Sequence, residues 1–128
     1  MKKVEVVAAV IQNGKKILAT QRGYGEFKDG WEFPGGKIET GESREEALIR
    51  EIQEELTVTI KIQEFLKTVE FDYSEFHLIM HCFLCEIAKG ELRLLEHESA
   101  KWVTREELDD IEWLPADVLL VSKLKERI

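Results

Sequence analysis

Cysteine is scarce in this sequence, and its two cysteines do not form a recognisable centre. Cys82 and Cys85 are three positions apart in a chain of 128 residues. They lie in an apolar stretch typical of a β-strand, where that spacing turns the two side chains to opposite faces. No second cysteine pair or nearby histidine set completes a zinc site. We therefore expect two reduced, packed thiols instead of a disulfide within the pair or a zinc centre.

The sequence also lacks a hydrophobic run of transmembrane length. Its start, Met1-Lys2-Lys3, leads into an alternating pattern and not into the apolar core of a signal peptide. We therefore expect a cytoplasmic protein that has no membrane partner.

Positive charge is in the minority, because 18 Lys and Arg face 26 Asp and Glu, for a net charge of −8. This balance disfavours nucleic-acid polymers and anionic membranes as partners. A small anionic substrate remains compatible where a bound metal ion and local bases attract it. No repeat, low-complexity tract or linker divides the chain, so we expect one domain over residues 1–128, and both a monomer and a homodimer stay open.

Alternating apolar residues and turn signals predict a series of β-strands. Asn13-Gly14 is a hairpin turn signal, Pro34-Gly35-Gly36 is expected to end the third strand, and the fourth strand is expected to bend near Phe65. The predicted strands are Val4–Gln12, Lys16–Arg22, Trp31–Phe33, Thr59–Tyr73, His77–Ile87, Glu91–Leu95 and Ala100–Val103.

Helix signals separate and follow these strands. Thr104 with Glu107 forms a capping box that opens a short helix, and Pro115 favours the first position of a C-terminal helix. Strands with helices on either side predict an α/β sandwich around a mixed β-sheet. The expected apolar face of the C-terminal helix consists of Val118, Leu119, Val121 and Leu124.

The stretch Gly36–Val58 has the most distinctive pattern in the chain. A glycine-containing loop leads to Ser43, which begins a helix through a capping box with Glu46. At about 100° per residue, three glutamates share one arc beside an apolar stripe. The arc consists of Glu51, Glu54 and Glu55, and the stripe consists of Leu48, Ile52 and Leu56, with Ile49 beside it.

Two interpretations of the three glutamates are open from spacing alone. A solvated acidic helix face is common, although like charges three and four residues apart cost about 0.2–0.5 kcal/mol per pair. A cluster of carboxylates next to an apolar stripe also suits a hard divalent cation shared with substrate phosphates.

The same stretch resembles the Nudix box, which reads G-x5-E-x7-R-E-U-x-E-E-x-G-U, where U is a bulky aliphatic residue. The one departure among the nine defined positions is Thr57, which stands where the family has glycine. Glycine after a helix adopts the left-handed conformation at little cost, whereas a β-branched residue is strained there, so we expect the helix exit to differ from that of the family. The matching positions are Gly36, Glu42, Arg50, Glu51, Ile52, Glu54, Glu55 and Val58.

Features outside the box resemble the small MutT-type and CTP-pyrophosphohydrolase-type members of the family. The resemblance implies a Nudix-type α/β/α sandwich around a mixed sheet, and hydrolysis of nucleoside triphosphates to a monophosphate and pyrophosphate with Mg²⁺, for which Mn²⁺ substitutes. The features are Val6–Ile11, Gln21-Arg22, Trp31–Lys37, Glu96 six residues before Trp102, and Leu114–Asp117.

The resemblance also implies roles for individual residues in catalysis. Glu51, Glu54 and Glu55 hold the metal ion, with the Gly35 carbonyl and Glu96 as further ligands. Glu51 is the first choice for general base, with Glu96 or Glu54 as alternatives. Arg50 belongs to the same catalytic group. It lies one helical turn from Glu54 and from Glu46, so we expect an orienting ion pair, which is also compatible with a salt bridge on the helix surface. Gly36 and Glu42 are expected to have supporting roles.

Residues outside the box are expected to choose the substrate. Arg22 and Lys37 are candidates for phosphate contact, although a solvated role is also open. Phe33 either walls the base or belongs to the core. Asp117 stands where MutT enzymes carry a base-reading Asn, and Phe76 where they carry an Arg. Ionised Asp only accepts hydrogen bonds, which suits the cytosine N4 amine, whereas a protonated Asp also suits a purine.

These observations favour a pyrophosphohydrolase that prefers cytosine nucleotides such as CTP, dCTP and 5-methyl-dCTP. An 8-oxo-dGTP diphosphatase, which cleans the nucleotide pool, is the close alternative. Two further alternatives are a hydrolase of ADP-ribose or another nucleoside diphosphate compound, and a ligand-binding Nudix module without catalysis.

Overall fold

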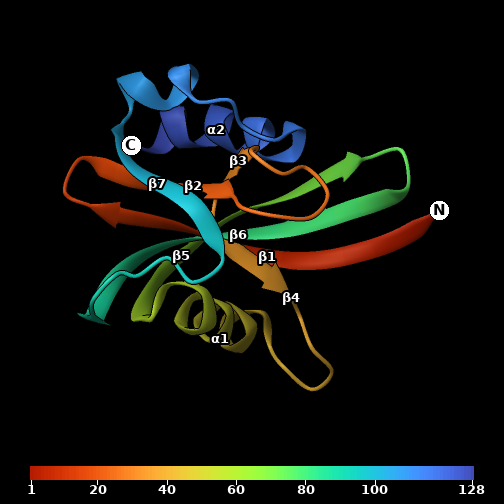
Figure 1. The fold of residues 1–128 in the computed structure, drawn as a ribbon, viewed down its shortest axis with the longest axis horizontal. Helices are drawn as coiled ribbons and strands as arrows, with labels where there is room; N and C mark the ends of the chain where they lie inside the picture. Colours follow the sequence, from red (N-terminus) through yellow and green to blue (C-terminus); the bar gives the residue numbers. More distant parts are fainter.

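The computed structural model describes residues 1–128 as three layers, with a mixed β-sheet between helices (Figure 1). Helix α1 covers one face of the sheet, and helix α2 with the short 3₁₀ helix η1 covers the other. The predicted α/β sandwich is therefore confirmed. The elements are β1 (Lys2–Asn13), β2 (Lys16–Arg22), β3 (Trp31–Glu32), β4 (Gly35–Lys37), α1 (Arg44–Leu56), β5 (Val58–Asp72), β6 (Phe76–Gly90), β7 (His97–Thr104), η1 (Glu106–Asp110) and α2 (Pro115–Arg127).

The sheet has the strand order β3-β2-β1-β6-β5, with β4 beside β1 and β7 beside β2. The β1–β6 pairing is parallel, and the other strand pairings are antiparallel. β1 contacts β2 only through Gln12 and Asn13 at the hairpin, whereas the earlier part of β1 lies between β4 and β6. The strands β4 and β3 are thereby brought to the middle of the molecule, where both cavities described below open.

Two hydrophobic cores lie on the two faces of this sheet. Alternate residues of β1 supply both, because Ala8 and Val10 face α2 while Val7 and Ala9 face α1. The same alternation separates the cysteines, since Cys82 packs in the α2 core and Cys85 in the α1 core. Both are free and buried, which confirms the expectation of packed thiols.

Helix α1 begins as the sequence predicts. Ser43 accepts a hydrogen bond from the Glu46 N–H, and the Glu46 carboxylate accepts one from the Ser43 N–H, so the capping box is complete. The buried residues are Ala47, Leu48, Ile52 and Leu56, and full burial of each leucine or isoleucine stabilises the fold by about 2 kcal/mol. Ile49 was expected beside this stripe but remains 39% exposed.

The expectation of an altered helix exit at Thr57 is wrong. Thr57 adopts the left-handed conformation that the family's glycine would adopt, with φ 61° and ψ 23°. Its N–H donates to the Gln53 carbonyl, and its hydroxyl donates to the Glu91 carbonyl at 2.7 Å. A hydrogen bond of about 1 kcal/mol offsets a left-handed penalty of similar size, so the backbone path is kept despite the β-branched side chain.

Three details of the predicted strands also differ. The hairpin turn is Gly14–Lys15, because Asn13 still pairs with Lys16. Gly35–Lys37 forms strand β4 against β1, where a loop was expected after the third strand. Residues 91–95 do not form a strand, because the N–H groups of Arg93 and Leu95 donate to carbonyls at the end of α1 instead.

The C-terminal part also combines confirmed and corrected expectations. Pro115 is the first residue of α2, as predicted. Val118 and Leu119 are 49% and 41% exposed, and the helix packs through Ala116, Asp117, Leu120, Val121 and Leu124. The Thr104 N–H and hydroxyl both donate to Glu107, without a reciprocal side-chain cap, and the helix that follows is 3₁₀. Neither α-helix, at 13 residues each, is long and apolar enough to cross a membrane.

Candidate active site

Two cavities meet at the centre of the molecule, and three residues line both of them: Arg22, Glu32 and Gly35. The first, here called the aromatic cavity, has a volume of about 120 Å³. The second, here called the acidic cavity, has a volume of about 290 Å³. The aromatic cavity is further lined by Val6, Val7, Ala8, Phe27, Phe33, Gly36, Tyr73, Phe76, Leu78, Met80, Leu114 and Asp117, and the acidic cavity by Tyr24, Gly25, Glu26, Glu55, Glu96 and His97.

The acidic cavity holds a carboxyl group in an unusual environment. The Glu55 side chain is only 12% exposed, and its Oε1 atom is buried without a hydrogen-bond partner. Burial, followed by the nearby negative charges of Glu51 and Glu96, raises the pKa of Glu55 to about 9. Glu96 lines the same cavity and accepts a hydrogen bond of 2.9 Å from the Tyr24 hydroxyl. A cation here would relieve the unfavourable burial of an ionised Glu55.

Arg50 organises the acids on the neighbouring side of α1. Its guanidinium donates to both carboxylate oxygens of Glu42, at 2.6 and 2.9 Å, and to Glu51 at 2.9 Å. It also contacts Glu54 at 3.3 Å and donates to the Lys37 carbonyl, which ties the helix to β4. The predicted pair with Glu54 is present, whereas the predicted pair with Glu46 is absent because Glu46 caps the helix. Hydrogen bonding by Arg50 lowers the pKa of Glu42.

The two glycines of β4 allow the acids and the strand to approach closely. A Cβ atom on Gly36 would lie 2.3 Å from the Glu51 Oε2 atom, and one on Gly35 would lie 1.9 Å from the Val7 carbonyl oxygen. Both distances are far below van der Waals contact. Gly36 therefore makes room for the Glu51 carboxylate, and Gly35 brings its backbone to the junction of the two cavities.

The donor groups fit a hard divalent cation in chemistry. Carboxylate and carbonyl oxygens are the ligands that such ions prefer, and Glu55, Glu96 and Gly35 present them to one cavity. No group of three or more acidic, histidine or cysteine side chains converges closely enough to enclose an ion. Glu51 and Glu54 are instead turned toward Arg50. The ligand set of Glu51, Glu54, Glu55, Glu96 and the Gly35 carbonyl therefore stays a prediction.

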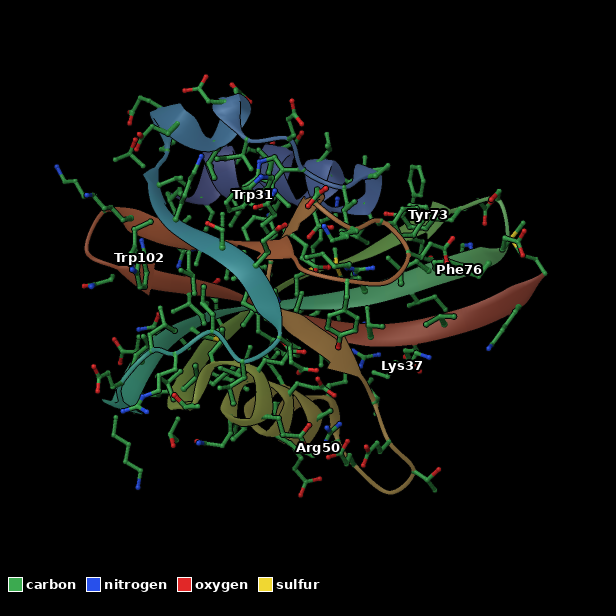
Figure 2. The ribbon with its side chains drawn as sticks, viewed as in Figure 1. Trp31, Lys37, Arg50, Tyr73, Phe76 and Trp102 are labelled. Atoms are coloured by element: carbon green, nitrogen blue, oxygen red, sulfur yellow. The ribbon has the colours of Figure 1, made fainter.

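The aromatic cavity lies on the α2 side of the sheet. Phe33 lines it and stacks on Trp113, with ring centroids 4.4 Å apart, so the two proposed roles of Phe33 as wall and as core are compatible. Tyr73 and Phe76 lie next to each other by the turn between β5 and β6 (Figure 2), with centroids 5.1 Å apart. Phe27 adds a third ring, 5.0 Å from Tyr73. Flat, apolar walls of this kind suit a planar heterocycle.

Asp117 provides a polar group to this apolar cavity. The residue is 4% exposed, and its Oδ2 atom accepts a hydrogen bond of 3.0 Å from the Phe33 N–H. Burial raises the pKa of Asp117 to about 8, although the hydrogen bond from Phe33 acts in the opposite direction. The carboxyl group is therefore mostly protonated at neutral pH, and it offers a donor as well as an acceptor.

The two basic residues predicted to contact phosphate lie in different places. Arg22 sits at the junction of the cavities, where it donates to both oxygens of Glu32 and to the Glu26 carbonyl. Lys37 lines neither cavity; it borders a separate hollow with Lys2 and Lys3. The structure thus brings Arg22, but not Lys37, beside the other candidates.

Sequence reasoning missed two polar residues of the site. Glu32 lines both cavities and holds Arg22, yet the sequence assigned it only to a short strand and to the Trp31–Lys37 feature, without a role in the site. His97 follows Glu96, and its side chain is only 7% exposed and lies 3.9 Å from Glu55. The signal that could have found His97 is its neighbour Glu96, which the family resemblance already placed among the expected metal ligands.

Comparison with known proteins agrees with this geometry. A family model described as the NUDIX domain matches residues 1–125. The CTP pyrophosphohydrolase of Escherichia coli (strain K12) is 36% identical over 123 residues, which cover 95% of this chain and 91% of that protein. The 8-oxo-dGTP diphosphatase of the same organism is 32% identical over 127 residues, which cover 98% of each.

Solved structures give the same result. The solution structure of the E. coli ORF135 protein matches with a TM-score of 0.84 at 34% identity, over 98% of this chain and 91% of that one. The matched domain, the similar length and the acid-bearing helix beside a cavity thus agree. The chain belongs to the Nudix family, as a MutT-like hydrolase that acts on phosphoanhydride bonds.

Proposed function

We propose that this protein hydrolyses nucleoside triphosphates to a monophosphate and pyrophosphate, with a preference for cytosine nucleotides. The observation that carries the preference is Asp117, a buried carboxyl group that lines a small aromatic cavity. Its Oδ2 atom accepts the Phe33 N–H with one lone pair, so Oδ1 and the second lone pair of Oδ2 are left for a base. Specificity therefore depends on one carboxyl group between flat apolar walls.

Cytosine matches both protonation states of this group. Its N4 amine donates and its adjacent N3 accepts, so a protonated Asp117 can donate to N3 while accepting from N4, and an ionised Asp117 accepts from N4. Phe76 places an apolar ring in the cavity where the MutT resemblance implies an Arg.

An 8-oxo-dGTP diphosphatase is the second candidate, and one observation favours it. Burial raises the pKa of Asp117 to about 8, and a protonated Asp presents a donor and an acceptor as Asn does. This pair of groups also matches the edge of an oxidised guanine. The relative named 8-oxo-dGTP diphosphatase is 32% identical and the one named CTP pyrophosphohydrolase 36% identical, a difference too small to choose between them.

Nudix hydrolases generally use divalent metal ions, and we propose Mg²⁺ here, with Mn²⁺ as a substitute. A cation held by the carboxylates and the Gly35 carbonyl would supply charge neutralisation and water activation. Glu51 is our first choice for general base, since Arg50 holds its Oε1 atom while Gly36 leaves room for Oε2. Arg22 remains our candidate for phosphate contact because it lies where the two cavities meet.

The test is a comparison of the wild type with Asp117→Asn in Mg²⁺-dependent hydrolysis. The assay measures kcat/KM for CTP, dCTP, 5-methyl-dCTP, 8-oxo-dGTP and ADP-ribose, with identification of the products. We expect the wild type to prefer cytosine nucleotides. The comparison with Asp117→Asn is made at pH 9, where Asp117, with a pKa of about 8, is mostly ionised and only accepts hydrogen bonds, whereas Asn also donates. The variant should there shift the ratio toward 8-oxo-dGTP by about 10-fold or more, since a matched pair of hydrogen bonds contributes about 1–3 kcal/mol to discrimination.

Asp110→Asn is the matched control, because Asp110 is exposed on η1 and lines neither cavity. An unchanged substrate ratio in Asp117→Asn would return Asp117 to a purely structural role. A wild type that prefers 8-oxo-dGTP would favour the second candidate. Hydrolysis of ADP-ribose alone, or no Mg²⁺-stimulated hydrolysis at all, would replace both with a different hydrolase or a binding module.

A further inference from the structure

His97 is a buried polar side chain that none of the roles above explains. It is the first residue of β7, and β7 pairs with β2 so that His97 lies opposite Arg22. Its side chain is only 7% exposed and lines the acidic cavity. Its Nδ1 atom is buried without a hydrogen-bond partner. A buried ring nitrogen without a partner costs about 1–3 kcal/mol, so another interaction is needed to account for a histidine here.

Glu55 faces this histidine and has the same deficit. The Glu55 Oε1 atom is the other buried side-chain atom in the molecule without a partner, and it lies 3.9 Å from the His97 Nε2 atom. This distance is too long for a hydrogen bond, but a shift of about 1 Å by either side chain would form one. The unpartnered Glu55 Oε1 atom thus faces the Nε2 side of the His97 ring, so a hydrogen bond between Nε2–H and Oε1 would give Glu55 the partner that it lacks.

No other basic group is available to Glu55. Arg50 holds Glu42, Glu51 and Glu54 but makes no contact with Glu55. Arg22 is engaged by Glu32 and the Glu26 carbonyl. The Tyr24 hydroxyl donates to Glu96. Among the groups that line the acidic cavity, His97 is therefore the donor left for Glu55.

We propose that His97 is a positioning residue, which donates a hydrogen bond from its Nε2–H group to the Glu55 carboxylate and thereby holds that carboxylate toward the acidic cavity. The proposal rests on the proposed function, since Glu55 is a predicted metal ligand. Ligand groups in metal sites are commonly held by such outer hydrogen bonds, and their loss costs about 10- to 100-fold in metal affinity or activity. His97 would thus do for Glu55 what Arg50 does for Glu51.

The two amide replacements of histidine provide a sharp test. The Gln side-chain amide reaches the place of the Nε2 atom, and the shorter Asn amide reaches only the place of Nδ1. The first measurement is the dissociation constant of Mn²⁺, followed by electron paramagnetic resonance without nucleotide. We expect His97→Gln to keep affinity near that of the wild type, and His97→Asn to weaken it by about 10- to 100-fold.

The second measurement separates kcat from KM for CTP with Mg²⁺. A positioning role predicts that His97→Asn lowers kcat with little change in KM, and that His97→Gln restores most of it. His77→Gln is the matched control, because His77 lies outside both cavities, where it contacts Glu70 and Asp72. It should leave Mn²⁺ affinity and kcat unchanged. Thermal unfolding of each variant shows that the fold is intact.

Equal Mn²⁺ affinity in folded His97→Gln and His97→Asn would overturn the proposal, whether both variants keep the wild-type affinity or both lose it to the same extent. If His97→Asn does not fold, His97→Phe replaces it, since Phe keeps the ring and lacks the N–H, and wild-type affinity in that variant would likewise contradict a positioning role. Failure of the proposed function would look different. The wild type would then hydrolyse no triphosphate, while His97→Gln and His97→Asn would still differ in Mn²⁺ affinity, and the His97–Glu55 pair would remain supported.

Discussion

The two cavities share a boundary at Arg22, Glu32 and Gly35 but differ in almost everything else. The aromatic cavity is lined by rings from the turn after β5, from β6, from the loop between β2 and β3 and from the residue after β3, and it contains Asp117. The acidic cavity is lined mainly by polar side chains from three separate segments, and it contains Glu55 and Glu96. The aromatic cavity therefore differs from the acidic one in having mainly apolar, flat walls, whereas charged groups dominate the acidic cavity.

Each cavity contains a buried acid with a raised pKa, but the surroundings of the two acids differ. Burial is the largest cause for both. Asp117 has a hydrogen-bond donor in Phe33, and Arg22 opposes the rise in its pKa. Glu55 has no partner for Oε1, and other carboxylates raise its pKa further. This difference is what our proposal predicts if Asp117 recognises a base as a neutral group and Glu55 binds a cation.

The largest expected effect tests the acidic cavity. Glu55→Gln should lower kcat/KM for CTP by at least about 100-fold, because a metal ion supplies several kcal/mol of charge stabilisation. Without metal the variant should unfold at the same temperature as the wild type or higher, since Gln resembles the protonated Glu55 of the folded state. Activity assays and thermal unfolding with and without Mg²⁺ provide the check.

Glu45→Gln is the control, because Glu45 is exposed in the first turn of α1. Near-normal turnover in Glu55→Gln would remove Glu55 from the metal site and would break the contrast between the two acids.

An intermediate effect tests the aromatic cavity through pH. The pKa of Asp117 is about 8 in the folded protein and roughly 3.9 in an unfolded chain, so between these values the folded state binds the extra proton. The free energy of unfolding that Asp117 contributes is therefore fully present below pH ~4 and falls as pH rises toward 8, by up to about 1.4 kcal/mol per pH unit.

Asp117→Asn cannot ionise and should lose this slope. Urea unfolding of the wild type and the variant at pH 5, 6, 7 and 8 without metal measures the difference, to which Glu55 contributes equally in both proteins. Asp110→Asn should follow the wild type. Parallel curves for Asp117→Asn and the wild type would mean that Asp117 is ionised in the folded protein.

The smallest effect is expected when one tyrosine hydroxyl is removed from the lining of each cavity. Tyr24→Phe removes the hydroxyl that donates to Glu96, and Tyr73→Phe removes the one that accepts the Ala116 N–H at the start of α2. One hydrogen bond contributes about 0.5–1.5 kcal/mol. Because Tyr24 is exposed and Tyr73 partly buried, we expect Tyr24→Phe to lower kcat about 2- to 10-fold at constant stability, and Tyr73→Phe to lower stability by about 1 kcal/mol.

Steady-state kinetics and urea unfolding of both variants separate these outcomes. If Tyr24→Phe changed only stability, or Tyr73→Phe only turnover, the division between a charged reaction site and a packed recognition site would be wrong.

Local signals predicted much of the fold correctly. The capping box at Ser43, the buried stripe of α1 and the first position of α2 all depend on neighbours within four residues, so the sequence displays them directly. Thr57 shows where a local rule fails. The left-handed conformation is unfavourable for a β-branched residue, but the Thr57 hydroxyl donates to the Glu91 carbonyl, 34 residues away. The strand at Gly35–Lys37 was missed for the same reason, because its partner is β1 and its glycines carry no strand signal.

The sequence by itself determined the family, the acid-bearing helix and the identity of most candidate residues, because these reside in a contiguous pattern of side chains. Only the tertiary structure decided how those residues are paired. It placed Arg50 against Glu42, Glu51 and Glu54, buried Asp117 against Phe33, and left Glu55 facing His97. The Arg50 pairs are local, whereas the contacts of Asp117 with Phe33 and of Glu55 with His97 join segments tens of residues apart that meet only in the folded chain. The protonation states follow from that packing, since pKa values respond to neighbours in space and not in sequence.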